Sequence, residues 1–326
     1  MENIVVIKTK EELKISNLKR GLVHRFQIHL SDNALGVPWR IPVIIIRGIG
    51  KGPTVGVTAA IHGNELNGIS TIFKLIQNVD PMDLSGTLVM LPISNVPGYL
   101  MNQRNFIDNI DLNRIMPGKL TGAPSDIYAH YLCNKVIKKF DYLLDLHTAS
   151  HGRVNSLYIR ADIDNPEVRN LAYLQNPQII VKKYDEHGTL RSWANSNRIP
   201  CITIEIGNPN AFQHNLIDET QHGIINTLKF LKMLEGESNF LDTNPTICDH
   251  SFWIHSTKGG VVDVTANLAE KVNKGDILAT VYDVFGQVKE KIISTHTGVV
   301  IGKNVRPNCE VGTRLVHLGV DFVRES

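Results

Sequence analysis

Two histidines and one glutamate in this sequence have the types and the spacing of the ligands of a catalytic metal ion. His62 and Glu65 lie three residues apart, between an apolar segment and a segment with helical periodicity, and His147 closes a later apolar segment. Two imidazoles and one carboxylate form a known zinc shell in hydrolytic enzymes, with a fourth position left for water. A position on a strand-to-helix turn lets His62 and Glu65 reach one point. We therefore predict one Zn²⁺ per chain, bound by His62, Glu65 and His147.

A second acid and an arginine would complete this site as a hydrolase. Zn²⁺ lowers the pKa of a bound water and polarises a carbonyl group, so a carboxylate must accept the proton of the water and pass it to the leaving nitrogen. Glu205 closes the apolar segment 201–207 beside a glycine and is the predicted general base and acid. Arg104 is predicted to help the metal hold the oxyanion.

Three further residues are predicted to support this chemistry. Asn113 and Arg114, in a loop without regular periodicity, would bind a substrate carboxylate, for which arginine offers a planar pair of donors. Asp145 precedes His147 by two residues on one predicted strand, so both side chains point to one side, and Asp145 would orient the imidazole. Each motif alone is weak evidence, because short pairings of this kind also arise by chance. The prediction rests on their combination, in order, at the ends of strands.

The segments around these residues predict an α/β fold. Short apolar runs alternate with stretches in which apolar residues recur at helical spacing. Strands that are apolar throughout are typical of a mixed, mostly parallel sheet covered by helices on both faces, and ligands of such sheets bind outside the carboxyl ends of the strands. The predicted strands are 54–60, 87–94, 142–147, 156–161, 178–183 and 201–207; the predicted helices are 64–79, 125–140, 166–174, 189–197 and 220–234.

A domain boundary is expected at the polar, turn-rich segment 236–245. Residues 1–245 would form the catalytic domain. Residues 246–326 lose helical periodicity and are rich in Val, Ile, Thr and Gly, which predicts a small all-β domain. The Gly-Val-Val at 260–262 is repeated at 298–300, each followed by a similar apolar pattern, which indicates two similar hairpin units folded face to face.

Composition excludes several classes of function. The chain has 326 residues, of which 42% are hydrophobic and 20% charged, and its net charge of +2 argues against nucleic-acid binding through a broad basic surface. The apolar run 43–46 is far too short to cross a membrane, and charges within the first residues exclude a signal peptide. Four widely spread cysteines without a CxxC pair indicate the cytoplasm. The sequence leaves self-association into a homo-oligomer open.

The motifs resemble those of the succinylglutamate desuccinylase/aspartoacylase family, a branch of the zinc carboxypeptidase fold. They are HGNE at 62–65, DLNR at 111–114, DLHT at 145–148 and EIG at 205–207, and the similarity covers roughly residues 40–235. This resemblance implies the same zinc ligands, general base, carbonyl-polarising arginine and substrate-binding pair as above. It also implies hydrolysis of the amide of a small N-acyl amino acid, with an acylated metabolite as the partner and no nucleic acid or membrane.

The continuation of the metal-binding strand resembles a sub-branch of that family. In it, Arg153 and Asn155 are predicted to line the pocket, and His151 is interpreted as a loop residue because the metal shell is complete without it. The C-terminal domain resembles a biotinyl/lipoyl-type β-hammerhead. Its tight turn carries Phe285 where a carrier domain has lysine, which disfavours a swinging-arm role. In the deacylases such a domain partly covers the mouth of the active site, which favours small substrates.

Three alternatives remain at the level of sequence. The same site could trim the C-terminus of short peptides as a metallocarboxypeptidase, or it could cleave esters or thioesters. A protein of another class, a non-catalytic metal-binding module, would have no need for both Glu205 and Arg104.

Overall fold

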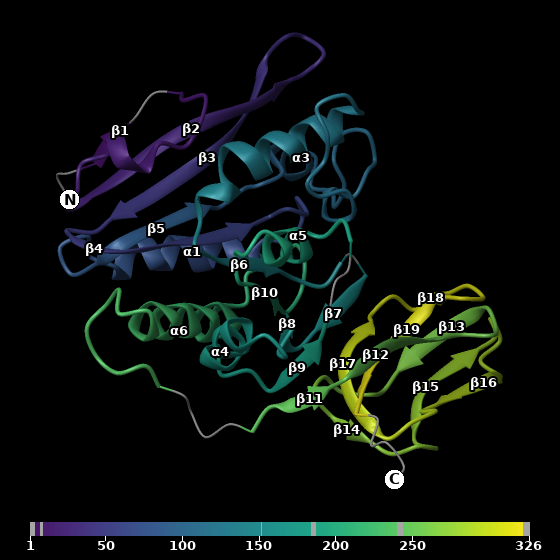
Figure 1. The fold of residues 1–326 in the computed structure, drawn as a ribbon. Helices are drawn as coiled ribbons and strands as arrows, with labels where there is room; N and C mark the ends of the chain where they lie inside the picture. The colour runs from purple at the N-terminus through teal and green to yellow at the C-terminus, as the bar shows by residue number, and fades with distance from the viewer. Residues whose placement is uncertain (1–3, 7–8, 151, 184–186, 240–243, 322–326) are drawn as a thin grey trace.

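The computed structural model describes residues 4–6, 9–150, 152–183, 187–239 and 244–321 (Figure 1). It shows a large mixed sheet with helices on both faces, followed by smaller antiparallel sheets at the C-terminal end of the chain. The predicted fold class is therefore confirmed. No helix among these residues is long and apolar enough to span a bilayer.

The large sheet has ten strands, in the order β1-β2-β3-β5-β4-β6-β10-β8-β9-β11. Its central strands β4, β6 and β10 are parallel neighbours, and His147 on β6 lies opposite Glu205 on β10. The register therefore brings a predicted metal ligand and the predicted base to the same edge of the sheet. The strands are β1 (Ile4–Val6), β2 (Leu22–Asp32), β3 (Pro38–Arg47), β4 (Gly50–Ala59), β5 (Ser85–Leu91), β6 (Tyr142–His147), β8 (Leu157–Ala161), β9 (Ile179–Lys182), β10 (Cys201–Ile206) and β11 (Thr246–Cys248).

Two hydrophobic cores cover the two faces of this sheet. One core packs the apolar stripes of α1 (Asn67–Asn78), α4 (Pro166–Leu174) and α6 (His214–Phe230) against the sheet. The other core holds α3 (Pro124–Lys135) and α5 (Leu190–Ser196). The remaining short helices are α2 (Val96–Leu100) and the 3₁₀ turns η1 (Ile15–Asn17), η2 (Leu112–Arg114) and η3 (Ile137–Lys139).

Most predicted elements appear within a few residues of their expected bounds, with two corrections. Helix α6 spans 214–230 and not 220–234. It begins six residues earlier, and Ile217 near its start is already buried. It ends earlier because Lys232 adopts a φ of 57°, which a helix cannot include. The predicted helix 125–140 is α3 followed by the separate turn η3, because Val136 leaves helical geometry with φ −125° and ψ −65°.

The C-terminal strands form two antiparallel sheets, β12-β19-β17-β14 and β16-β15-β13-β18. Each of the two sequence repeats forms one antiparallel pair, β13 with β15 in the first and β17 with β19 in the second. The repeats also pair with each other, because β13 pairs with β18 and β17 pairs with β14. The strands are β12 (His250–His255), β13 (Gly260–Val264), β14 (Lys271–Val272), β15 (Ile277–Tyr282), β16 (Val288–Ile293), β17 (Gly298–Asn304), β18 (Asn308–Cys309) and β19 (Arg314–Val320).

One short strand from the earlier part of the chain joins the C-terminal sheet. Strand β7 (Arg153–Asn155) pairs antiparallel with β17, so that Asn155 lies opposite Gly302. A Cβ at Gly302 would lie 2.3 Å from Asn155 Oδ1, so this close pairing requires glycine.

The predicted domain boundary after residue 245 stays a prediction. Strand β11, which follows that boundary, still belongs to the large sheet.

Candidate active site

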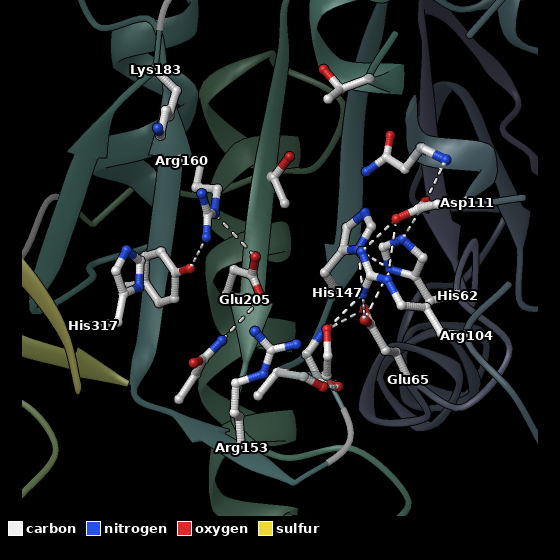
Figure 2. A pocket seen from close by; sticks show the side chains of 18 of the residues that line it. His62, Glu65, Arg104, Asp111, His147, Arg153, Arg160, Lys183, Glu205 and His317 are labelled. Carbon is white, nitrogen blue, oxygen red and sulfur yellow. Dashed lines mark hydrogen bonds and ion pairs between the residues drawn. The ribbon is translucent and has the colours of Figure 1, made fainter. Parts of the chain in front are cut away.

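His62, Glu65 and His147 meet at the carboxyl ends of β4 and β6 (Figure 2). His62 Nδ1 lies 2.9 Å from Glu65 Oε1, His147 Nδ1 lies 3.1 Å from Glu65 Oε2, and the two Nδ1 atoms are 3.2 Å apart. The histidines are 3% exposed and the glutamate 2%. Three potential ligand atoms from distant parts of the chain therefore face one point in a nearly dry environment.

The outer nitrogens of both imidazoles are bound to carboxylates. Nε2 of His147 donates to Asp145 Oδ2 at 2.8 Å, and Nε2 of His62 donates to Asp111 Oδ1 at 3.0 Å. Thr58 Oγ1 donates to the other oxygen of Asp145 at 2.6 Å and holds it in place. Hydrogen bonds of this kind keep the proton on Nε2 and leave the Nδ1 lone pair for a metal. The donor set therefore fits a divalent cation, and the predicted orienting contact of Asp145 is confirmed.

Charge within the cluster is balanced in a way that favours a bound cation. Burial alone would raise the pKa of Glu65, but the charge of His62 and hydrogen bonds from both imidazoles lower it below its ordinary value. Burial alone would lower the pKa of His147, but Asp145 and Glu65 raise it well above 6.5. A buried carboxylate thus stays ionised and draws positive charge onto the imidazoles, and a metal ion can replace the protons that supply that charge.

These shifts predict how the stability of the metal-free protein depends on pH. The lowered pKa of Glu65 stabilises the fold above its ordinary value of 4.5, and this contribution is lost as the pH falls. The raised pKa of His147 stabilises the fold below 6.5, and this contribution is lost as the pH rises through the folded-state value. In chelator-treated protein, this cluster should therefore contribute most to the free energy of unfolding between pH 4.5 and pH 6.5. Urea titrations of wild type and Glu65→Gln across the pH range test this; a difference between them that grows steadily toward acid pH would contradict it.

Arg104 and Asp111 link the two sides of the metal cluster. The Arg104 guanidinium donates to Glu65 Oε1 at 2.9 Å, to Asp111 Oδ2 at 2.9 Å and 3.2 Å, and to Ser150 Oγ at 2.7 Å. Asp111 in turn holds His62, so the contacts close a ring around the ligands. The motif that contains Asp111 can be seen in the sequence. The contact of Asp111 with His62 joins residues 49 positions apart, so no local pattern predicts it.

Asp111→Asn should weaken zinc binding by about 10–100-fold, the usual effect of removing a carboxylate behind a ligating histidine. The amide can donate to Nε2 and so favours the wrong tautomer of His62. Zinc affinity would be measured by competition with a chromogenic chelator. Asp108→Asn is the matched control, because Asp108 lies on the same loop and, within the described residues, accepts from the backbone N–H groups of Ile110 and Ser125 and contacts no metal-ligand candidate. Equal affinity in wild type and Asp111→Asn would show that Asp111 does not position His62.

Glu205 lies across the pocket from the metal cluster, at the end of β10 (Figure 2). Its residue is 8% exposed, and its carboxylate accepts hydrogen bonds from Arg160 Nε at 3.1 Å and Asn155 Nδ2 at 3.3 Å. Neither contact involves a metal ligand. The carboxylate is therefore held in place near the cluster without belonging to it, as the prediction of a proton-transfer role requires.

The pocket between these groups has a volume of about 410 Å³. It is lined by the three predicted metal ligands and by Glu205, Arg104, Asn113 and Arg114. Asn113 and Arg114 lie on its wall. Asn113 Oδ1 accepts from the Leu190 N–H at 2.7 Å, and Arg114 donates to the Asn113 carbonyl at 2.8 Å. Their roles in substrate binding stay predictions. The predicted lining positions of Arg153 and Asn155 are confirmed, whereas His151 lies outside the described residues.

The C-terminal strands supply part of the pocket, and sequence reasoning identified none of these residues. Trp253 on β12 stacks on His317 of β19, with ring centroids 5.0 Å apart and planes 11° apart. His317 in turn meets Tyr158 edge to face at 6.4 Å. No local motif marks these positions, because they reach the pocket only through tertiary packing. The residues contributed by these strands are Ser251, Trp253, Arg314 and His317.

The sequence and the fold are both similar to those of known proteins. The model of the succinylglutamate desuccinylase/aspartoacylase catalytic domain matches residues 51–231. The N-alpha-acetyl-L-2,4-diaminobutyric acid deacetylase of Halomonas elongata is 26% identical over 260 residues, which are 75% of this chain and 74% of the relative.

Two solved structures show the same architecture over nearly the whole chain. The product-bound ectoine utilization protein EutE (DoeB) from Ruegeria pomeroyi superimposes with a TM-score of 0.85 at 22% identity, covering 95% of this chain and 99% of that one. A succinylglutamate desuccinylase/aspartoacylase from Rhodobacter sphaeroides superimposes with a TM-score of 0.82 at 22% identity, covering 96% and 100%. At these identities the superpositions establish the fold.

Proposed function

Because the chain belongs to the succinylglutamate desuccinylase/aspartoacylase family, we propose that it is a zinc-dependent hydrolase that cleaves the amide bond of a small N-acyl amino acid. The observation that carries this proposal is the buried His62–Glu65–His147 cluster facing Glu205 across one pocket. Residues 1–245 would be the catalytic domain, with residues 246–326 covering its mouth. The cytoplasm is the proposed location, since the cysteines show no pairing pattern.

The ligand set supports zinc among the divalent ions. Two imidazole nitrogens and one carboxylate suit Zn²⁺, whereas Mg²⁺ and Ca²⁺ prefer oxygen ligands. Bound at His62, Glu65 and His147, zinc would supply Lewis acidity toward water and toward the amide carbonyl. Asp111 and Asp145 would keep the two histidines in the ligating tautomer.

The remaining side chains would carry the proton and hold the substrate. Glu205 would accept the proton of the attacking water and deliver it to the leaving nitrogen, with Arg160 and Asn155 holding its carboxylate in position. Arg104 lies beside Glu65 and would stabilise the charge that develops on the carbonyl oxygen. Asn113 and Arg114 would bind the carboxylate of the amino acid.

A hydrolysis screen with zinc-loaded protein tests this function. N-acetyl, N-succinyl and N-formyl amino acids would be compared with short peptides and with matching esters. We expect turnover of at least one N-acyl amino acid that exceeds turnover of every peptide. Faster removal of C-terminal residues from peptides would replace the proposal with a carboxypeptidase, and absence of turnover on all of them would leave a metal-binding module.

A further inference from the structure

The carboxylate of the proposed general base is held by residues of two different sheets. Arg160, which donates to Glu205 Oε1 at 3.1 Å, lies on β8 of the large sheet, next to β10 (Figure 2). Asn155, which donates to Glu205 Oε2 at 3.3 Å, lies on β7. Among the described residues, β7 pairs with β17 of the C-terminal sheet and with no strand of the large sheet. One oxygen of Glu205 therefore owes its partner to the C-terminal strands.

Strand β17 and the residue that follows it hold the main chain of β7 at both ends. Before β7, the Gly152 carbonyl accepts from the Val305 N–H at 3.0 Å. After β7, the N–H and the hydroxyl of Ser156 both donate to the Ile301 carbonyl at 3.0 Å. Asn155 lies between these two anchors and is 7% exposed. The backbone that carries Asn155 is thus fixed against the C-terminal sheet.

Gly302 allows the Asn155 side chain to lie against β17. The two residues are opposite each other in the antiparallel register, and a Cβ at position 302 would lie 2.3 Å from Asn155 Oδ1. A side chain at this position must therefore displace a neighbouring group. The next neighbour is the Val154 carbonyl oxygen at 3.0 Å, so the Asn155 amide has to move furthest. Because Oδ1 and Nδ2 belong to one planar amide, this movement also changes the position of Nδ2 relative to Glu205.

We propose that β17 is a positioning element for the general base. Gly302 fixes the place of the Asn155 amide, and Asn155 fixes the orientation of the Glu205 carboxylate. The inference rests on the proposed function and gives the C-terminal strands a part in proton transfer, in addition to covering the mouth of the pocket. A base must be aimed at the proton that it accepts, and a displacement of about 1 Å can lower a rate by about 10²-fold.

Gly302→Ala in the zinc-loaded full chain tests this proposal, with the best substrate of the hydrolysis screen. We expect kcat to fall by at least about tenfold, because the misplaced Asn155 no longer orients Glu205. KM should change by less than about threefold, since the change affects the reacting geometry and not substrate binding. Zinc content should stay unchanged, because the hydrogen bond of Asn155 goes to Glu205 and not to a metal ligand.

Lys303→Ala is the matched control on the same strand. Lys303 follows Gly302 and pairs with Val154 through its backbone, but its side chain donates to the Ala266 carbonyl at 2.6 Å. Its loss disturbs the C-terminal sheet and leaves the space beside Asn155 unchanged. Lys303→Ala should therefore keep kcat within about threefold of wild type. Urea unfolding of both variants gives the change in stability against which the loss of activity is judged.

A double-mutant cycle with Asn155→Ala tests whether Gly302 acts through Asn155. Asn155→Ala alone should lower kcat by at least about tenfold. Alanine lacks the Oδ1 atom that the new Cβ would meet, so adding Gly302→Ala should lower kcat further by less than about twofold. The double variant also relieves the steric conflict, so this comparison with Asn155→Ala decides the proposal even if Gly302→Ala alone does not fold.

Three kinetic results would overturn the proposal. They are a wild-type kcat in Gly302→Ala, an equal loss of kcat in Lys303→Ala, and losses that multiply in the double variant. If no amide is hydrolysed, the proposed function fails, and crystal structures of Gly302→Ala and Lys303→Ala test the positioning by themselves. The hydrogen bond from Asn155 to Glu205 should be absent in the first and present in the second, and its retention in Gly302→Ala would refute the inference.

Discussion

Glu205→Gln is expected to lower kcat by about 10³-fold while the bound zinc stays in place, since a positioned general base contributes about 10²–10⁴-fold. The amide keeps the size of the side chain and can still accept the hydrogen bond from Arg160, but it cannot take a proton from water. Because Glu205 is not part of the His62–Glu65–His147 cluster, its loss should not change metal content.

Zinc stoichiometry and single-turnover rates on the same preparation separate these effects. Glu219→Gln on α6 is a suitable control, because Glu219 is exposed and lies outside the pocket. A Glu205→Gln enzyme that retains kcat within about tenfold of wild type would assign proton transfer to another group.

His147→Ala should abolish both zinc binding and turnover. His147 is one of three proposed ligands among the described residues, and a catalytic zinc site uses three protein ligands and leaves one position for water, so the two ligands that remain should hold the ion too weakly. The substitution also removes a hydrogen-bond partner from Asp145 and from Glu65, which are 0% and 2% exposed, so the free energy of unfolding should fall as well.

Metal content after dialysis, residual hydrolysis and urea unfolding would be measured together. His222→Ala provides the control, since His222 lies on α6 with an exposed side chain away from the pocket. Full activity with one zinc per chain in His147→Ala would show that His147 is not a zinc ligand.

The sequence predicts those parts of the site that follow directly from strand ends. His147 and Glu205 close runs of apolar residues that form central strands, and the parallel register of β6 and β10 then brings them opposite each other. Helix α4 matches its predicted bounds because Asn165 caps it, accepting from two N–H groups of the first turn, and Pro166 starts it.

Other parts of the fold carry weaker local signals. Strands β2 and β3 were not predicted, although Phe26, Ile28 and Leu30 are buried at every second position of β2. Polar residues alternate with these apolar ones, so β2 contains no continuous apolar run, and only the alternation indicates a strand.

The pocket residues from the C-terminal strands could not be predicted at all. Trp253, Arg314 and His317 reach the pocket because β7 pairs with β17 and because His317 of β19, on which Trp253 stacks, contacts Tyr158. The strand pairing and the contact with Tyr158 join segments more than 90 positions apart, so no periodicity or motif in either segment reports them. The positions of these residues in the pocket therefore depend on tertiary packing.

The most direct test of the metal site is a crystal structure of zinc-loaded protein with anomalous diffraction at the zinc edge. The expected result is one strong peak per chain, within about 2.0–2.2 Å of Nδ1 of His62, Nδ1 of His147 and a carboxylate oxygen of Glu65. A zinc peak at other residues, or a fully active crystal with no peak among these three, would contradict the assignment.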